Sequence, residues 1–203
     1  MNKRGLTLVE LVAVLVILSI IAVIVTPTIN GNIRDYKEQM YTNQLEAIKD
    51  SAVNFSADNA SEDYFPKTDK QALKITLSEL QQDGYIDENI KNPKDGGYFD
   101  PNETFVLVTC EIMKDEQLQY KDNYKYTYKT YLSIDDYIKS EAIRYAKEKN
   151  ITSTTTISSS SLNIYKTLKT TNNSVTETVS FKSVELTVSH TKEGYEYIAK
   201  VNK

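Results

Sequence analysis

One cysteine and one histidine are the side chains in this 203-residue sequence best suited to nucleophilic chemistry. A cysteine nucleophile needs a base within hydrogen-bond reach, and His190 is the sole histidine available to Cys110. Nothing in the spacing of the two residues brings them together. Cys110 lies inside a β-rich run, which favours a small buried residue over a catalytic thiol. The sequence therefore predicts no catalytic residue and no enzyme activity.

Neighbouring carboxylates offer a second kind of chemistry, general acid–base catalysis. The pairs considered for this role are those at residues 115–116 and 135–136. Both fit turns and helix N-termini better than catalytic positions, because acidic side chains stabilise the positive end of a helix. The sequence also contains no Gly-rich phosphate loop, nucleophile elbow or His-Glu-x-x-His zinc motif.

An oxygen-rich loop between Asp95 and Glu103 raises the question of calcium. Asp95, Asp100, Asn102 and Glu103 carry the oxygen ligands that calcium prefers, but not in the spacing of an EF-hand. Glycine at 96 and 97 and proline at 101 predict a solvated turn equally well. We expect no metal and no cofactor, and a turn at these positions.

Charge and composition exclude further classes. The chain has 24 Lys+Arg and 28 Asp+Glu, a net charge of −4, which gives no electrostatic footprint for nucleic acid. One cysteine excludes an internal disulfide framework and any multi-cysteine metal site. The 15 tyrosines are typical of sheet surface and core, and can also supply contacts between subunits.

The first 33 residues contain few charged side chains, and these lie almost entirely before Gly5. Lys3 and Arg4 precede an apolar run from Leu6 to Val25, in which Glu10 is the sole charged side chain. At about 1.5 Å per residue, a helix of that length spans roughly the 30 Å of a hydrocarbon core. The two cations predict a cytoplasmic N-terminus, with everything after Val25 outside.

Three interpretations of this run compete. A secretory signal peptide would have a shorter apolar core followed by a small-x-small cleavage site, which is absent here. A plain signal anchor fits the length but leaves Glu10 unexplained. A carboxylate inside a bilayer costs about 2.5–3.5 kcal/mol on insertion scales, so it needs a partner.

The third interpretation comes from a resemblance. The run Lys-Arg-Gly-Leu-Thr-Leu-Val-Glu at residues 3–10, followed by an apolar helix, resembles the class III signal of type IV pilins and pseudopilins. In that family a membrane prepilin peptidase cuts after the glycine and methylates the new amino group. The resemblance implies cleavage between Gly5 and Leu6, with Leu6 N-methylated. Leu6 departs from the phenylalanine that is usual at this position, and Pro27 lies where many members carry a helix-bending proline.

The charge of Glu10 can be explained by the processing that this family undergoes. After cleavage, Leu6 carries a cationic amine about one helical turn from Glu10. In a staggered bundle, Glu10 of one subunit can meet the Leu6 amine of its neighbour, so assembly offsets the cost of burying both charges. The pairing would set axial register as a buried polar residue does in a coiled coil, and Thr7 could hydrogen-bond at the same place.

Helical periodicity continues beyond the apolar run. Apolar residues recur at steps of three to five positions from Ile33 to Phe55, which predicts one long helix from Leu6 to Asn54. Pro27 and Gly31 predict a bend. We expect the first half to span the membrane and the second half to lay an apolar stripe against a globular domain.

The remaining residues predict a small α+β domain. Residues 56–72 are expected to form a loop, and Thr76 with Glu79 forms a capping box for a short helix that ends before Gly84. The segment 75–101 resembles a patch common in pilin-like proteins of Gram-positive bacteria. Strands are predicted over 105–112 and 120–132, with a turn at 114–117.

The C-terminal part predicts a helix and a hairpin. Ser133 is expected to cap a helix that reaches Lys149. The Ser/Thr/Asn-rich residues 151–174 fit a linker or an edge strand, and composition does not decide between them. Alternation up to Val188, a turn at 192–194 and a return strand predict an antiparallel hairpin.

These observations give one fold class, α+β. A long N-terminal helix, with a membrane half and an amphipathic half, packs on a small antiparallel sheet domain in the lollipop shape of pilins. The expected segments are a leader at 1–5, a transmembrane and filament-core helix at 6–25, its amphipathic half at 26–56, and an extracytoplasmic domain at 57–203.

The main functional hypothesis is a structural subunit of a type IV pilus-like, competence or type II secretion-like filament. It implies a single-pass cytoplasmic membrane protein that later enters a cell-surface filament. Its partners would be the prepilin peptidase, other pilin subunits of the same or different kind and, indirectly, the assembly ATPase and platform. The alternative is a bitopic, signal-anchored extracellular binding protein that is not processed at Gly5.

Overall fold

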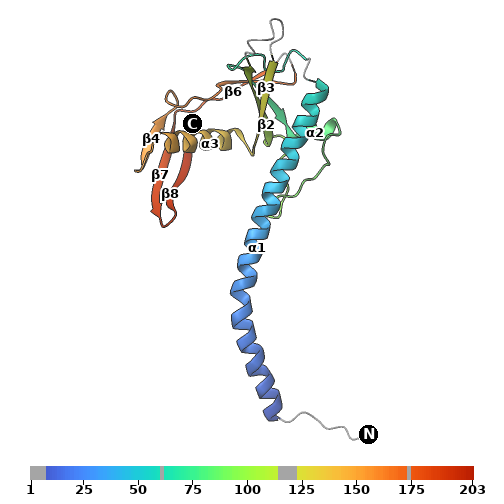
Figure 1. Cartoon of the computed structure of the whole chain (residues 1–203), viewed down its shortest axis with the longest axis vertical. Coiled ribbons are helices and arrows are strands. Elements are labelled where there is room, and N and C mark those ends of the chain that lie inside the picture. The colour runs from blue at the N-terminus through green and yellow to red at the C-terminus, as the bar shows by residue number, and fades with distance from the viewer. Residues whose placement is uncertain (1–7, 60–61, 114–122, 173–174) are drawn as a thin grey trace. The chain divides into compact units, whose positions relative to one another are not determined.

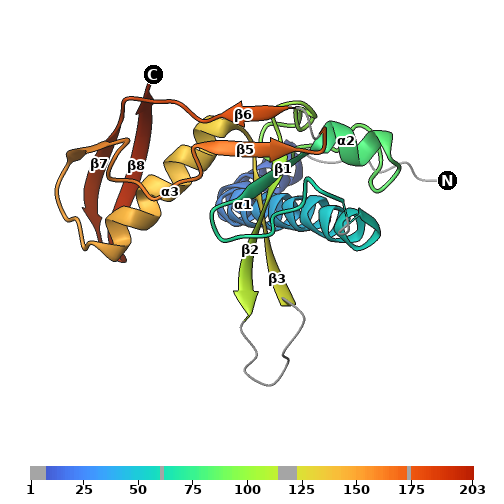
Figure 2. The same ribbon diagram turned by 90° about the horizontal axis from the view of Figure 1, so that it is seen from above.

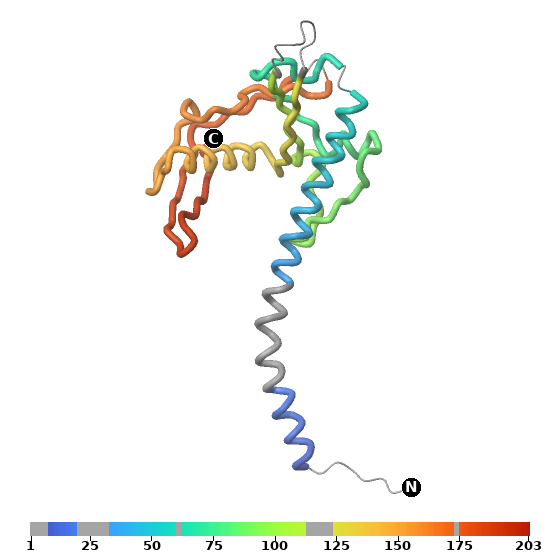
Figure 3. The backbone as a smooth tube through the Cα atoms, viewed as in Figure 1, coloured from blue at the N-terminus to red at the C-terminus, as the bar shows by residue number. Residues whose placement is uncertain are grey.

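The computed structural model describes the backbone of residues 8–59, 62–113, 123–172 and 175–203, and the side chains of these residues except 20–32, 113 and 123 (Figure 3). The chain forms two compact units. The first comprises residues 1–44 and 92–97, and the second comprises residues 45–91 and 98–203. Each unit is considered by itself below.

Helix α1 runs from Leu8 to Asn59 without interruption, through Pro27 and Gly31 (Figure 1). The predicted end at Asn54 is therefore five residues too early, and 56–59 are helical rather than loop. The last turns are supported locally, because Ser56 Oγ donates to the carbonyl oxygen of Ala52 over 2.7 Å and Asn59 Nδ2 to that of Phe55 over 2.9 Å. In both contacts a side chain bonds to the carbonyl four residues back, which also serves the helix's own hydrogen bonds, so the side chain is held along the helix surface.

A five-stranded sheet, ordered β3-β2-β1-β5-β6, forms the first half of the second unit. Its strands are β1 (Ala72–Thr76), β2 (Phe105–Met113), β3 (Asn123–Tyr131), β5 (Thr167–Thr170) and β6 (Thr176–Thr178). All pairings are antiparallel except that of β1 with β5, which is parallel. Figure 2 shows β5 and β6 side by side. The predictions for β2 and β3 are confirmed, while the predicted turn at 114–117 lies outside the described residues.

The central strand β1 was not predicted. Residues 72–76 were expected to end a loop and to cap a helix, yet Ala72, Leu73 and Ile75 are fully buried. Lys74 interrupts the apolar run in the sequence, so the segment lacks the signal of a buried strand. In the structure, Lys74 Nζ lies 2.6 Å from Glu177 Oε2 of β6, which accounts for a lysine in this position.

Helix α2 (Leu77–Gln82) follows β1 directly and confirms the predicted capping box. The Thr76 hydroxyl accepts a hydrogen bond from the backbone N–H of Glu79 at 3.2 Å, and the Glu79 carboxylate accepts one from the backbone N–H of Thr76 at 2.6 Å. Gly84, with φ of +77°, follows the helix end in the left-handed conformation that glycine adopts without strain.

The two faces of the sheet contact different helices. Thr130 Oγ1 in β3 donates to the carbonyl oxygen of Leu45 in α1 over 3.1 Å, and its cross-strand partner Val106 is buried. Residues directly opposite in a ladder share a face, so the even-numbered positions of β2 and β3 face α1. Phe105 and Leu107, on the opposite face, belong to a cluster with α3.

Helix α3 (Ile134–Glu148) packs on the three-stranded sheet β4-β7-β8. The strands are β4 (Thr155–Ser158), β7 (Ser183–Thr191) and β8 (Gly194–Asn202). The predicted cap at Ser133 and the C-terminal hairpin are confirmed. Gly194, with φ of +125°, closes the hairpin turn.

Residues 151–174 hold two strands. β4 is an edge strand, one of the two predicted alternatives, whereas β5 lies inside the five-stranded sheet between β1 and β6. Threonine-rich strands of four residues resemble polar linkers in composition, which hides β5 from sequence reasoning.

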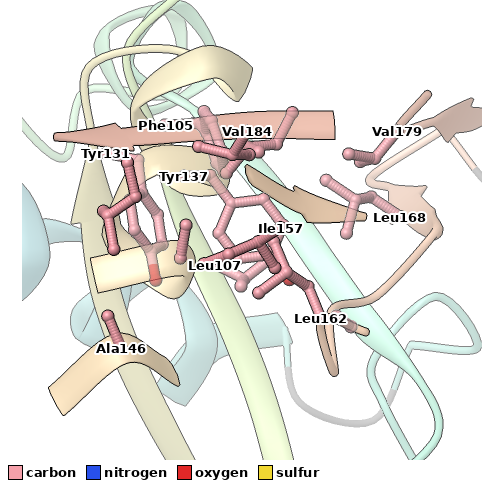
Figure 4. Close-up of a cluster of buried hydrophobic side chains, with 14 residues drawn as sticks. Phe105, Leu107, Tyr131, Tyr137, Ala146, Ile157, Leu162, Leu168, Val179 and Val184 are labelled. Carbon is pink, nitrogen blue, oxygen red and sulfur yellow. The ribbon is translucent and has the colours of Figure 1, made fainter. Parts of the chain in front are cut away.

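One hydrophobic cluster joins the five-stranded sheet, α3 and the three-stranded sheet (Figure 4). Tyr131 and Tyr137 meet with ring centroids 5.0 Å apart, and Leu186 of β7 is fully buried in the same cluster. Ala142 and Ala146 give α3 a small-residue face that lies close to the sheet.

The apolar stripe predicted along the second half of α1 is divided. Ile48, Ala52 and Phe55 are buried, as expected, but Ile33 and Tyr36 are exposed. The expected packing stripe is therefore confirmed only for the part of α1 that belongs to the second unit.

Candidate functional site

The predicted processing site lies at the extreme N-terminus. Gly5, Leu6 and Thr7 lie outside the described residues. Glu10 occupies the first turn of α1, where an acidic side chain interacts favourably with the helix dipole, and it is exposed. The roles predicted for these four residues stay predictions.

The surface of α1 next to Glu10 is apolar on every side. Each large apolar side chain between Leu8 and Leu18 is 48–79% exposed. Residues 14–18 are consecutive and all apolar, and five consecutive residues surround a helix of 3.6 residues per turn. A helix that is hydrophobic all round is normally buried, so this surface requires a partner environment that a single chain does not provide.

The predicted membrane span and kink fall partly outside the described side chains. Across the described part of the chain, no helix is both long enough and apolar enough to cross a membrane. The span over residues 6–25 stays a prediction, and so does the bend at Pro27, since the side chains of 20–32 are not described.

A second feature of the first unit is a loop held against α1. Lys94 Nζ lies 3.1 Å from Glu38 Oε2 and 3.9 Å from the centroid of the Tyr41 ring. Within the loop, Asp95 Oδ1 accepts a hydrogen bond from the Gly97 backbone N–H over 2.8 Å. These contacts fix residues 92–97 on the helix surface.

The oxygen-rich loop residues act as turn caps. Asp100 Oδ1 accepts hydrogen bonds from the backbone N–H groups of Asn102 (2.9 Å) and Glu103 (3.2 Å). Among the residues described, no group of three or more His, Cys, Asp or Glu side chains could hold a metal ion. The carboxylates here support the turn that the sequence favoured over a calcium site.

Cys110 and His190 lie in different sheets. The Cys110 thiol is buried in β2 and donates to the carbonyl oxygen of Thr68 at 3.1 Å, and burial raises its pKa. His190 is exposed on β7 and packs edge-on against Tyr195. A thiol with a raised pKa is a weak nucleophile, so Cys110 behaves as the small buried residue that the sequence predicts.

The carboxylate pair at 135–136 stabilises the start of α3. Asp136 Oδ2 accepts a hydrogen bond from the backbone N–H of Leu132 at 3.0 Å, while the backbone N–H of Asp136 donates to Ser133 Oγ at 3.2 Å. Asp135 pairs with Lys203 at 3.2 Å. This arrangement is a helix cap, as predicted; the pair at 115–116 lies outside the described residues.

Sequence reasoning missed one feature of the second unit, a cavity of about 640 Å³ beside α3. Mostly polar, charged and tyrosine side chains line it, from residues 69–70, β2, β3, α3 and residues 163–165. Because these segments lie far apart in the sequence, no motif or spacing could have indicated the cavity.

Comparison with known proteins bears on the N-terminal segment and on about half of the chain. Residues 1–26 match the family model of the prokaryotic N-terminal methylation motif. A curated relative, type II secretion system core protein G of Klebsiella michiganensis, is 28% identical over 106 residues, which cover 48% of this chain and 72% of the relative. No solved structure matches the chain. The two matches confirm the resemblance that residues 3–10 carry: the chain is similar to type IV pilins and pseudopilins.

Proposed function

We propose that this chain is a structural subunit, a pilin or pseudopilin, of a type IV pilus-like, competence or type II secretion-like filament. The observation that carries the proposal is the exposed apolar surface between Leu8 and Leu18, with Glu10 in its first turn. Packing such helices side by side removes their apolar surface from water or lipid and forms a filament core.

The proposal includes a maturation step. A prepilin peptidase cuts between Gly5 and Leu6 and methylates the new Leu6 amine. Glycine leaves the scissile bond unhindered because it has no side chain. The Leu6 amine then pairs with Glu10 of a neighbouring subunit, and Thr7 hydrogen-bonds beside it. This pairing fixes the axial register of the subunits.

Localisation and partners follow from that maturation. Before assembly the chain spans the cytoplasmic membrane once, with residues 1–5 on the cytoplasmic side and the second unit outside. The kink at Pro27 separates the membrane segment from the rest of α1. Partners are subunits of the same or a related kind and, indirectly, the ATPase and platform that drive assembly. The relative's printed name, a core protein of a type II secretion system, supports the secretion variant.

The intact mass of the mature protein tests this proposal. In cells that contain a prepilin peptidase, the expected product lacks residues 1–5 and carries one added methyl group on Leu6. A Gly5→Leu variant serves as the control, because a branched side chain at the scissile bond blocks cleavage and leaves the leader attached. A mature wild-type protein that retains residues 1–5, or that begins after Val25, would contradict the proposal. An uncut chain would instead favour the signal-anchored binding protein.

A further inference from the structure

Strand β8 lies at one side of the sheet β4-β7-β8, so only β7 pairs with it among the described strands (Figure 1). Its other side, called the open edge below, is 9 residues long. Proteins usually protect a long open edge with proline, a short strand or charges of one sign. β8 has no proline, and its two charged residues, Glu196 and Lys200, have opposite signs. The usual protection is therefore missing from the open edge.

The hairpin turn identifies the backbone groups along the open edge. Thr191 and Gly194 pair across a two-residue turn, so hydrogen-bonded pairs with β7 occur there and at every second position beyond. The N–H and C=O groups of the odd-numbered residues from 195 to 201 therefore point away from β7. The Val188 N–H agrees with this alternation, because it donates to Thr154 Oγ1 on the β4 side of β7 over 3.2 Å. None of the described residues forms a hydrogen bond with these outward groups.

The two faces of β8 have different surroundings. The odd-numbered side chains pack against the hydrophobic cluster that includes α3, with Tyr197, Ala199 and Val201 partly buried there. The even-numbered side chains lie on the opposite face, which is polar apart from one residue. Ile198, 61% exposed, is the sole apolar side chain on that face of the three strands. An exposed isoleucine in the middle of an open edge is suited to contact with another chain.

A second copy of β8, running antiparallel, offers partners for the outward backbone groups. In an antiparallel pair, residues that point outward from one strand must lie opposite residues that point outward from the other. A pairing centred on Ile198 places Tyr197 of one copy opposite Ala199 of the second copy. The same register places Tyr195 opposite Val201. Each outward N–H and C=O group along the open edge then has a hydrogen-bond partner.

The exposed side chains match in the same register. Glu196 of each copy lies opposite Lys200 of the other, and the two Ile198 side chains meet on the symmetry axis. These are non-hydrogen-bonded pairs, in which the Cα atoms are about 4.5 Å apart and the side chains are close. Lys200 Nζ lies 4.0 Å from Glu185 Oε2 in its own chain, so the pairing places this lysine between two carboxylates. Glu196 forms no ion pair with any described residue, and the pairing supplies one.

Other registers and other strand edges lack this match. Sliding one copy by two residues sets Ile198 opposite Glu196 or Lys200, and parallel strands in register place like charges side by side. β3, at one side of the five-stranded sheet, has Lys125 and Lys129 as its charged residues, so two copies of that edge repel each other. The other outer strands, β4 and β6, have four and three residues.

We propose that the open edge of β8 binds the open edge of a second copy of this chain, with antiparallel strands and two-fold symmetry about Ile198. The contact joins the two three-stranded sheets into one. A contact made by one strand is small beside the about 1,200 Å² that stable interfaces bury, so it forms where chains are concentrated, and dilute chains stay apart. The contact does not use α1 and is independent of the proposed function.

Disulfide trapping of the full-length chain in detergent micelles tests the contact. Ile198→Cys brings two thiols together on the symmetry axis, at a Cα separation that a disulfide accommodates. Thr187→Cys is the matched control, because Thr187 is exposed on the same face but lies on β7, one strand further from the open edge. With copper phenanthroline as oxidant, Ile198→Cys should give at least tenfold more disulfide-linked dimer than Thr187→Cys. The native Cys110 is buried, and the wild-type chain sets the background.

Two further comparisons test the register and the charges. A mixture of Glu196→Cys and Lys200→Cys chains should give at least fivefold more dimer than either variant alone, because only the mixture sets two thiols opposite each other. In the Ile198→Cys background, Glu196→Lys should lower the dimer yield at least threefold, because it sets lysine opposite lysine. Glu88→Lys makes the same charge change at an exposed loop residue outside the sheet and should leave the yield unchanged.

Several results would overturn the proposal. Equal dimer yields from Thr187→Cys and Ile198→Cys would indicate random collision, and an Ile198→Cys yield at the wild-type background would exclude the contact. A yield from Glu196→Cys alone that equals that of the mixture would indicate parallel strands. An unchanged yield with Glu196→Lys would refute the charge match. Because each result is a disulfide between stated positions, association through α1 or a failure of filament assembly would leave all of these outcomes readable.

Discussion

At the level of single residues, Glu10 is the residue of the N-terminal segment that bears most directly on the proposed function. It is the sole charged residue between Gly5 and Ile33, and the helix around it exposes apolar side chains on every face. A carboxylate in such a surface is costly in lipid or in a helix bundle unless it meets a positive charge.

Replacing Glu10 separates processing from assembly. Glu10→Ala should leave cleavage after Gly5 intact, because the scissile bond lies five residues away, but should lower the amount of subunit in sheared filaments at least fivefold. The measurement is the ratio of filament-bound to membrane-bound protein on immunoblots. Glu10→Asp, which keeps the charge, serves as the control and should retain more incorporation than Glu10→Ala. Equal incorporation of Glu10→Ala and wild type would contradict the proposed pairing of Glu10 with the Leu6 amine of a neighbouring subunit.

Buried tyrosines predict a loss of stability at alkaline pH. Burial raises the pKa of Tyr137 from its ordinary value of 10.0 to about 12, so between these values the folded chain holds a proton that the unfolded chain has released. The free energy of unfolding therefore falls as pH rises through this window, at about 1.4 kcal/mol per pH unit. Below pH 10 the protonated Tyr137 makes its full contribution to stability. Tyr137 alone should account for about 2–3 kcal/mol of loss.

Urea denaturation at pH 8, 10 and 11.5 measures this effect. Tyr137→Phe should be less stable than wild type at pH 8, because the Tyr165 N–H loses its acceptor, and should lose less further stability on going to pH 11.5. Tyr36→Phe changes an exposed tyrosine and should behave like wild type. Parallel pH profiles for wild type and Tyr137→Phe would contradict the assignment.

At the level of elements, the β7–β8 hairpin has one buried and one exposed face. Leu186 is fully buried in the cluster with α3, whereas Ile198, on the other face, is 61% exposed. Leu186→Ala should lower the free energy of unfolding by about 2–5 kcal/mol, because it leaves a cavity in a packed core. Ile198→Ala should change it by less than about 0.5 kcal/mol. Calorimetric melting of both variants checks this, and similar melting temperatures for the two would refute the face assignment.

Periodicity explains which elements could be predicted. β3, α3 and the hairpin each repeat apolar residues at their own period, whereas β2 is a continuous run of β-forming residues. Thr76 and Ser133 mark helix starts through side chains that cap the backbone. β1 was not predicted because Lys74 interrupts its apolar run. β5 was not predicted because Leu168 is its sole apolar residue. Both strands owe their place to partners distant in sequence, which local patterns do not reveal.

The same distinction applies to the sites. Glu10 and its apolar surroundings lie within one continuous segment, so residue order alone indicates them. The cavity beside α3 unites Lys129, Glu141 and Tyr165 from separate elements, and only folding brings these residues together. Cys110 was correctly predicted to be a buried strand residue because its neighbours form a β-rich run.

At the level of the whole molecule, the described side chains of α1 that are buried in the core of the second unit begin at Ile48. A fragment that begins at Arg34 keeps every buried residue of that unit, and also Glu38 and Tyr41, which hold Lys94. It should be soluble and monomeric and unfold in one cooperative transition, whereas the full-length chain should associate in the same detergent-free buffer. Light scattering and thermal melting test both expectations. A fragment without a cooperative transition would show that the N-terminal half of α1 is needed for folding.

The parallel pairing of β1 with β5 also sets an order in time. β1 is made early, but the neighbour that completes the sheet on that side follows only after β2, β3 and α3 have been synthesised. Until then the backbone groups along that side of β1 lack their strand partner, and an open strand edge can pair with another chain. Ribosomes that stop between α3 and β5 would therefore release chains with an adhesive edge, and such truncated products should be early targets of quality-control proteases.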